Sequence, residues 1–96
     1  MTHALSAREI EAAVGELGGW QHEGGKLVRR FRFGSFKEAL SFLVRVGLHA
    51  EELNHHPEIW NVYDQVTLSL CTHDAGDQVT GKDVELARAV NAFEWT

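Results

Sequence analysis

Four side chains in the second half of the sequence have types and a spacing suited to chemistry: Glu51, His55, His56 and His73. Glu51 and His55 are four residues apart, a spacing that places two side chains on one face of a helix. His55 and His56 directly precede Pro57, the only proline in the chain. Because imidazole titrates near neutral pH, several histidines beside a carboxylate can transfer protons without a cofactor.

The same side chains leave other interpretations open. Zinc binds histidine and carboxylate ligands, so Glu51, His55 and a further histidine could supply three ligands. The spacing matches no specific zinc signature, however, and adjacent histidines rarely point toward one ion. Clustered titratable groups mark functional sites only statistically, and many histidines in loops are simply solvated. On the residues alone we expect proton transfer ahead of metal binding, with no metal and no cofactor.

Capping signals and hydrophobic periodicity predict helices on either side of this cluster. Ser6 and Glu9 have the spacing of a capping box, and the helix that follows should end at Gly18, since glycine adopts the left-handed conformation readily. Thr80 and Asp83 repeat that spacing at the start of a short final helix.

A longer helix should begin after Ser35 and end near Asn54, because Pro57 disfavours helical geometry at the preceding residue. Its expected core-facing stripe comprises Phe36, Ala39, Leu40, Leu43, Val44, Gly47, Ala50 and Leu53. The two adjacent histidines therefore follow this helix, where the chain should turn toward the sheet.

Two hairpins supply the predicted strands. Gly24-Gly25 lies between strand-like residues 20–23 and 26–33, which is a hairpin signal. Residues 58–63 look extended, and residues 66–71 alternate between apolar and polar side chains.

The resulting order, α-β-β-α-β-β-α, predicts a single α+β domain over residues 1–96, with a four-stranded antiparallel sheet and helices packed on one face. The second hairpin should turn at Asp64-Gln65. In a hairpin the start of the first strand adjoins the end of the second. We therefore expect His55, His56 and His73 near the same edge of the sheet.

Composition limits the possible partners. A net charge of −5 argues against a general nucleic-acid binder, since that affinity depends on clustered Lys and Arg. No apolar stretch reaches the roughly 18 residues of a membrane span, and the first residues lack a signal-peptide core, so we expect a cytoplasmic protein. Cys71 should be a buried, neutral thiol. From their strand positions, Trp20, Trp60 and Tyr63 are expected in the core.

The motif around the histidines resembles the signature of the pterin-4a-carbinolamine dehydratases: Glu51-x-x-x-His55-His56-Pro57, then Tyr63, His73 and Asp83. Several stretches are similar to the sequences usual in the family at the same places: "EELNHHPEIWNVY", "VTLSLCTH", "KDVELA", "FKEALSFLVRVGLHAE" and Gly19-Trp20. The resemblance covers nearly the whole chain from about Leu17 onward, and the family fold agrees with the order of elements read from periodicity.

The resemblance implies dehydration of 4a-hydroxytetrahydrobiopterin to quinonoid dihydrobiopterin, which regenerates the pterin cofactor of aromatic amino-acid hydroxylases. It implies proton transfer by His55 and His73, orientation of the pterin by His56, and support from Glu51. The further positions that it implies around the pterin are Pro57, Thr72, Asp74, Trp20 and Asp83. Asn54 departs from the aspartate that members often carry, and Lys82 from a frequent arginine.

Two other roles known among relatives stay open. One is protein binding, in which a member stabilises the dimer of a transcription factor, and the other is pterin chemistry in molybdopterin metabolism. The resemblance also implies a homodimer or homotetramer, and a small antiparallel sheet has edge strands that need covering. We expect a small pterin molecule as the partner, and neither nucleic acid nor a membrane.

Overall fold

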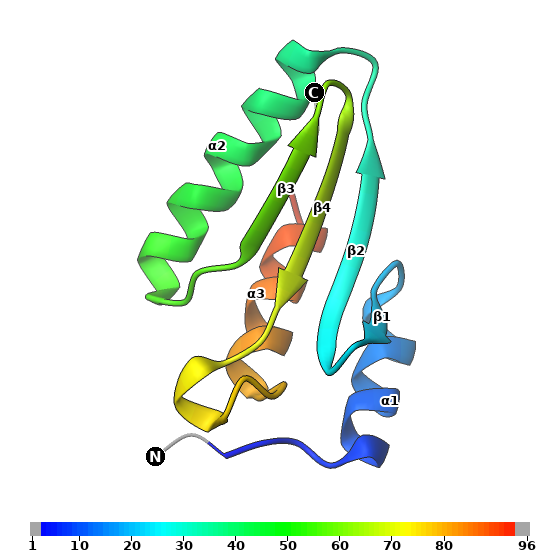
Figure 1. Cartoon of the computed structure of the whole chain (residues 1–96), viewed down its shortest axis with the longest axis vertical. Helices are drawn as coiled ribbons and strands as arrows, with labels where there is room; N and C mark the ends of the chain where they lie inside the picture. Colours follow the sequence, from blue (N-terminus) through cyan, green and yellow to red (C-terminus); the bar gives the residue numbers. More distant parts are fainter. Residues whose placement is uncertain (1–2, 94–96) are drawn as a thin grey trace.

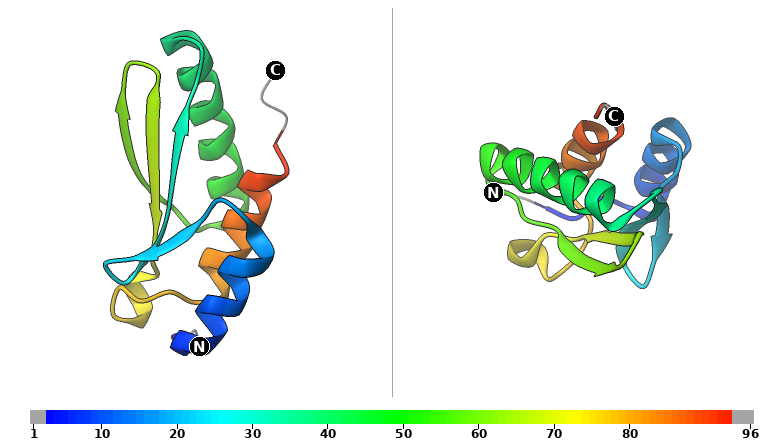
Figure 2. Two further views of the ribbon diagram at one scale, coloured as in Figure 1. Left: turned by 90° about the vertical axis from the view of Figure 1, so that its right-hand side faces the viewer. Right: turned by 90° about the horizontal axis from the view of Figure 1, so that it is seen from above.

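The computed structural model describes residues 3–93, and within that range it has the predicted order of elements (Figure 1). The elements are α1 Ala7–Leu17, β1 Gln21–Glu23, β2 Lys26–Arg32, α2 Phe36–Leu53, β3 Glu58–Val62, β4 Gln65–Leu70, the short 3-10 helix η1 His73–Ala75, and α3 Gly81–Asn91. The strands form one antiparallel sheet in the order β1-β2-β4-β3, and the helices cover one of its faces (Figure 2). Along the described chain, no helix is long and apolar enough to cross a bilayer.

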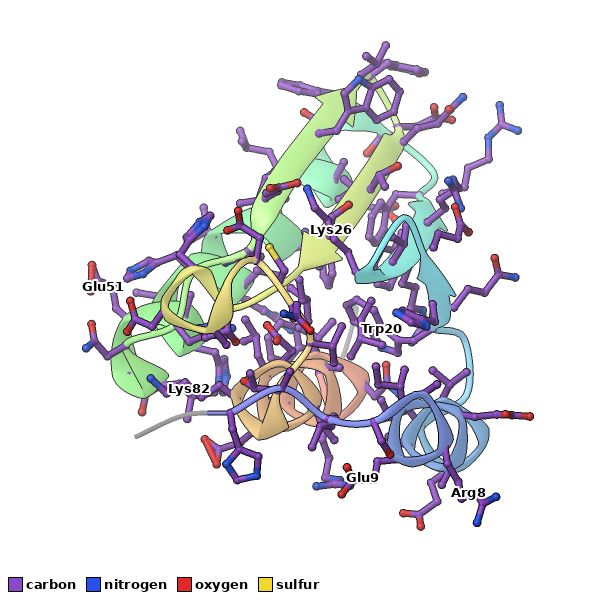
Figure 3. The ribbon with its side chains drawn as sticks, turned by 60° about the horizontal axis from the view of Figure 1, so that its bottom comes forward. Arg8, Glu9, Trp20, Lys26, Glu51 and Lys82 are labelled. Carbon is purple, nitrogen blue, oxygen red and sulfur yellow. The ribbon has the colours of Figure 1, made fainter. Side chains whose placement is uncertain are left out.

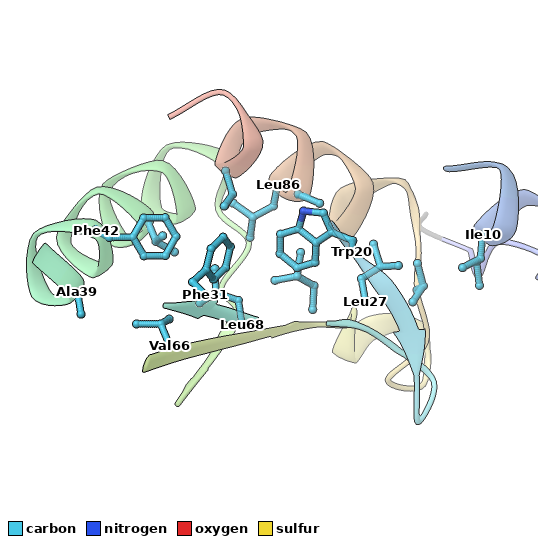
Figure 4. Packing of buried hydrophobic residues seen from close by; sticks show 14 residues of the cluster. Ile10, Trp20, Leu27, Phe31, Ala39, Phe42, Val66, Leu68 and Leu86 are labelled. Carbon is cyan, nitrogen blue, oxygen red and sulfur yellow. The ribbon is translucent and has the colours of Figure 1, made fainter. Parts of the chain in front are cut away.

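The core lies between the sheet and the three helices (Figure 4). Phe31 of β2 and Phe42 of α2 meet with ring centroids 4.8 Å apart, and Leu68 of β4 is fully buried beside them. Burying each such side chain stabilises the fold by about 1.5–3 kcal/mol. The sheet and α2 are thereby held in a fixed relation, which determines where the end of α2 meets the sheet.

The predicted helix signals are present. Ser6 and Glu9 form a reciprocal capping box on α1, and Thr80 and Asp83 form one on α3. Asn54 ends α2 in the left-handed conformation, with a φ of 52°, and its N–H bonds back to the last turn. The two histidines therefore leave the helix in a defined direction.

The stripe predicted for α2 was partly wrong. Ala39 and Ala50 are buried as expected, but the other buried residues of α2 are Phe42 and Val46. Three residues of the predicted stripe are instead exposed: Phe36, Leu40 and Val44. Leu48, which lies on the same side of the helix, is exposed as well. The helix carries two apolar faces, so periodicity could not show which one packs on the sheet.

Two predictions about the second hairpin were also wrong. The turn lies at Tyr63-Asp64, one residue earlier than expected, because Val62 pairs with Gln65. Trp60 and Tyr63 are exposed rather than in the core. β3 is an edge strand, and Trp60 lies opposite Thr67 on the face away from the helices, where no element covers it among the residues described.

Candidate active site

The candidate site lies where α2 ends, β3 begins, β4 ends and α3 begins. The antiparallel pairing of β3 with β4 places Glu58, the first residue of β3, opposite Ser69, near the end of β4. The chain before β3 and the chain after β4 are thus neighbours, as the hairpin argument predicted. Glu51 on α2 and Lys82 on α3 lie at this same end of the molecule (Figure 3).

A cavity of about 330 Å³ opens here, a size within the usual range for small-ligand sites. Six of the residues expected at a site line it: His55, His56, Pro57, Thr72, His73 and Asp74. The structure therefore brings together all three histidines of the predicted cluster, with polar groups that could contact a small polar molecule.

His55 is held against a buried carboxylate. Its Nε2 lies 2.5 Å from Oδ1 of Asp83, and the imidazole side chain is only 11% exposed. An ionised carboxylate can only accept hydrogen bonds, so Nε2 carries the proton and Nδ1 keeps the lone pair in the neutral ring. Such a pair orients the imidazole and stabilises the imidazolium when a proton is taken up.

Asp83 itself is fully buried and belongs to a satisfied network. Its Oδ2 accepts hydrogen bonds from Thr72 Oγ1 and from the backbone N–H of Thr80, both at 2.8 Å. Thr72 and Thr80 also share a hydrogen bond between their hydroxyls. Asp83 thus caps α3 and positions His55 at once. No atom of Asp83 is exposed to the cavity in this structure, so its place is behind the imidazole rather than beside a ligand.

His73 has a carboxylate partner of a different kind. Its Nδ1 lies 2.5 Å from Oδ1 of Asp77, and both side chains are mostly exposed. Asp77 follows Gly76 in the loop after η1, and both residues have positive φ. The loop conformation therefore holds the carboxylate beside the ring, which leaves the Nε2 of His73 for other partners.

His56 and Glu51 form a looser pair at the rim. Nε2 of His56 lies 3.7 Å from a carboxylate oxygen of Glu51, and both side chains are more than half exposed. Glu51 does not line the cavity. Glu51 was predicted to share a helix face with His55, but it contacts His56 instead. The reason is that α2 ends at Asn54, so His55 no longer follows the helical spacing.

Trp20 lies in the core and not at the cavity. It is 2% exposed, and its indole N–H donates to the side-chain oxygen of Asn91 at 2.8 Å. Its ring meets Phe31 edge-on. The resemblance placed this residue near the mouth of the pocket; in the described structure it instead joins β1 to α3.

Four residues that line the cavity were not among the expected site residues: Asn54, Glu58, Cys71 and Lys82. Glu58 forms an ion pair with Lys26 at 2.7 Å, which raises the pKa of that lysine. Burial raises the pKa of the Cys71 thiol above its usual value, and Cys71 is buried as expected. Glu58 begins β3 and Cys71 directly follows β4, and the resemblance assigned a site role to neither of them.

The metal ligands considered from the sequence do not converge. Nε2 of His55 is occupied by Asp83, and Glu51 contacts His56. Within residues 3–93 a different group brings three ligand atoms within 4.8 Å of one another: Cys71, His73 and Asp77.

A larger cavity of about 450 Å³ lies along β2, lined by residues 29–34 and Glu38. Its arginines at positions 30 and 32 are paired with Glu23 and Asp64. It contains none of the histidines, so the smaller cavity is the better candidate for chemistry.

This chain is similar to known proteins over almost its full length. Residues 3–93 match the family described as "Pterin 4 alpha carbinolamine dehydratase". The chain is 54% identical to a protein of Opitutus terrae over 99% of this chain and 98% of that protein, and 45% identical to one of Solibacter usitatus over 97% of each; both are named "Putative pterin-4-alpha-carbinolamine dehydratase".

A crystal structure from Brucella melitensis, titled as a transcriptional coactivator/pterin dehydratase, has the same fold. It superposes with a TM-score of 0.87 at 38% identity, and the match covers 93% of this chain and 96% of that one. The match over almost the whole chain, in sequence and in fold, shows that this protein belongs to the pterin-4-alpha-carbinolamine dehydratase family.

Proposed function

We propose that this protein dehydrates 4a-hydroxytetrahydrobiopterin to quinonoid dihydrobiopterin by histidine acid/base catalysis. The reaction removes a proton from N5 and delivers one to the departing 4a hydroxyl, which leaves as water. These two proton transfers balance the reaction without a change in oxidation state. The observation that carries the proposal is the cavity with three histidines, two of which are held by carboxylates.

His55 and His73 are the groups we assign to proton transfer. In each ring one nitrogen faces a carboxylate and the other is left for a substrate. A positioned acid or base of this kind contributes about 10²–10⁴-fold to a rate. Their opposite settings, one almost buried and one exposed, give the two proton transfers different environments.

The remaining residues are assigned to binding. His56 orients the pterin, and Glu51 supports it through the contact at the rim. Pro57, Thr72 and Asp74 line the cavity. Asp83 acts through His55, and we assign no substrate contact to it or to Trp20.

The direct test is a stopped-flow assay on synthetic 4a-hydroxytetrahydropterin, following the absorbance of the quinonoid product. His55→Ala and His73→Ala should each lower the rate by about 10²-fold or more. His22→Ala, which removes an exposed histidine on β1, is the matched control and should retain the rate. Folded His55→Ala and His73→Ala variants with unchanged rates would exclude the acid/base assignment.

The biological setting of the proposal is recycling of the pterin cofactor of aromatic amino-acid hydroxylases in the cytoplasm. A hydroxylase turning over its pterin should run faster when the purified protein is added, and a His55→Ala variant should give no such gain. If the wild type and His55→Ala increased the hydroxylase rate equally, the increase would not come from dehydration by His55, and the recycling role would be contradicted.

We also propose a homo-oligomer. Phe36, Leu40, Val44 and Leu48 recur every four residues and form an apolar stripe on α2, with side chains 46–62% exposed. β3 is an edge strand with Ile59 half exposed. Contiguous apolar surface of this kind marks an interaction site. A second copy of the chain can cover it. The alternative occupant is a transcription factor, because the Brucella protein is described as a transcriptional coactivator as well as a pterin dehydratase.

Light scattering on the purified wild type and on the Leu40→Glu variant tests the homo-oligomer. Leu40 is suitable because it is exposed, whereas a charge at a residue that packs against the core, such as Leu5, would also disturb folding. The wild type should be at least dimeric at micromolar concentration, and Leu40→Glu should shift it toward the monomer. A monomeric wild type would leave the stripe free for a different protein and contradict this proposal.

A further inference from the structure

Cys71, His73 and Asp77 form a cluster that the proposed chemistry uses only in part. Their ligand atoms lie within 4.8 Å of one another, and the three residues come from the end of β4, from η1 and from the loop after it. The thiol is buried, whereas the imidazole and the carboxylate are exposed. The cluster therefore has one fixed member and two members that can turn.

We propose that these three side chains form a binding site for a zinc-type divalent ion, and that an ion held there inhibits the enzyme by occupying His73. The inhibition rests on the proposed function, but the binding site does not. Thiolate, imidazole and carboxylate are the ligands that zinc prefers. Calcium and magnesium take oxygen ligands, so a site with a sulfur and a nitrogen selects against them.

A tetrahedral site requires the three ligand atoms, now within 4.8 Å of one another, to rearrange. Zinc bonds of about 2.0–2.3 Å place neighbouring ligand atoms roughly 3.3–3.6 Å apart. Nδ1 of His73 and Oδ1 of Asp77 lie 2.5 Å apart and are joined by a hydrogen bond, with one proton between them. An ion would replace that proton and move the two groups apart by about 1 Å, which is possible because His73 and Asp77 are 78% and 66% exposed.

Charge around the cluster allows a divalent ion. The thiolate and the carboxylate together neutralise two positive charges. Lys26 lies close enough to interact with Cys71 and Asp77, but its charge is matched by its ion pair with Glu58. The three protein ligands leave a fourth position open, as in zinc sites that bind water.

A ligand bond to His73 explains the inhibition. Zinc on Nδ1, the nitrogen that faces Asp77, takes the lone pair of that atom, so the neutral ring carries its proton on Nε2. Nε2 then has no lone pair with which to accept a proton from the substrate. His55 lines the cavity with Asp83 behind it, and it is not part of the cluster. One of the two proposed proton-transfer groups is thus blocked while the other is left intact.

Metal binding can be measured independently of enzyme activity. The metal-free protein is titrated with cobalt(II) to detect a thiolate ligand, and with zinc in competition with a chromophoric chelator to measure affinity. The wild type should bind one equivalent, and cobalt should give the near-ultraviolet band of a thiolate ligand. Cys71→Ser should abolish the band, and Cys71→Ser and Asp77→Asn should each weaken zinc binding by at least ~10-fold, since even loss of an outer partner of a ligand costs that much. Glu11→Gln, which removes an exposed carboxylate on α1, is the control and should bind like the wild type.

The wild-type protein supplies a second measurement if Cys71→Ser does not fold. Bound zinc should protect Cys71 from alkylation by iodoacetamide, and a chelator should restore the reaction. No protection, or equal zinc affinity in the wild type and in folded Cys71→Ser, overturns the site.

Inhibition is tested in the dehydratase assay, with each protein compared with its own zinc-free rate. One equivalent of zinc should inhibit the wild type reversibly and leave Cys71→Ser much less affected. Zinc bound through Cys71 without loss of rate overturns the inhibition. A protein with no dehydratase activity that still shows the cobalt–thiolate band contradicts the proposed function and leaves the metal site standing.

Discussion

Replacing Asp83 with asparagine should separate the positioning of His55 from the stability of α3. Asparagine has nearly the same shape as aspartate but carries one acceptor oxygen and one donor NH₂ group. If the oxygen stays toward Thr72 and Thr80, the NH₂ group faces Nε2 of His55. The imidazole must then move its proton to Nδ1, the nitrogen that should face the substrate.

The structure sets the size of both effects. A hydrogen bond to a charged acceptor contributes about 1.5–3 kcal/mol and one to a neutral acceptor about 0.5–1.5 kcal/mol. The bonds from Thr72 and Thr80 should each weaken by about 1 kcal/mol, and relief of the buried charge offsets part of that loss. We expect the unfolding free energy to fall by about 1–2 kcal/mol, and kcat to fall by about 10²-fold because the base has the wrong tautomer.

Thr80→Ala is the matched control, since it removes the N-cap hydroxyl of α3 without touching His55. It should cost about 1 kcal/mol of stability but change kcat little. Urea unfolding measures the first quantity and stopped-flow kinetics the second. Two-bond proton–nitrogen NMR correlations report the tautomer of His55, which only Asp83→Asn should change.

The reasoning fails if folded Asp83→Asn keeps the wild-type kcat and tautomer. It also fails if Thr80→Ala and Asp83→Asn lose kcat in equal measure, because the loss would then follow the stability of α3.

Three further predictions concern parts of the fold that support the site. Trp20→Phe removes the hydrogen bond from the indole N–H to Asn91. It should lower the unfolding free energy by about 1 kcal/mol and leave the KM for pterin unchanged. A raised KM would instead indicate that the indole contacts the pterin. Gly19→Ala should destabilise the protein in urea unfolding by more than about 1 kcal/mol, because φ is +85° and a Cβ would lie 2.8 Å from an arginine side chain of β2. Gly15→Ala, in open space on α1, should instead stabilise it by about 0.5–1 kcal/mol, and a gain at Gly19 as well would contradict the backbone argument. Burial raises the pKa of Cys71, so alkylation in metal-free buffer at pH 8 should be slower in the native protein than in urea, and equal rates would refute the raised pKa.

Local signals in the sequence predicted the elements well. Capping residues such as Ser6 and Thr80 act on backbone groups within three residues, so their effect does not depend on the rest of the fold. Gly24-Gly25 and Asn54 are similar cases, since each adopts a positive φ that few other residues tolerate. The α-β-β-α-β-β-α order followed from these signals.

Packing between elements was harder to predict. α2 carries apolar residues around much of its circumference, and only its docking on the sheet selects Phe42 and Val46 over Leu40 and Val44. The exposure of Trp60 depends on the place of β3 at the sheet edge. Strand order is a property of the whole chain, and local periodicity does not specify it.

The sequence by itself determined the family, the order of elements and the histidines that meet at one cavity. It did so because a hairpin fixes which strand ends are neighbours, and because the His55-His56-Pro57 motif is specific. The tertiary structure decided what stands behind each histidine. Asp83 is 28 residues from His55 in sequence, and only the docking of α3 brings its buried carboxylate to the ring. Contacts between distant elements arise from packing in three dimensions, whereas Cys71, His73 and Asp77 meet through the conformation of one short loop.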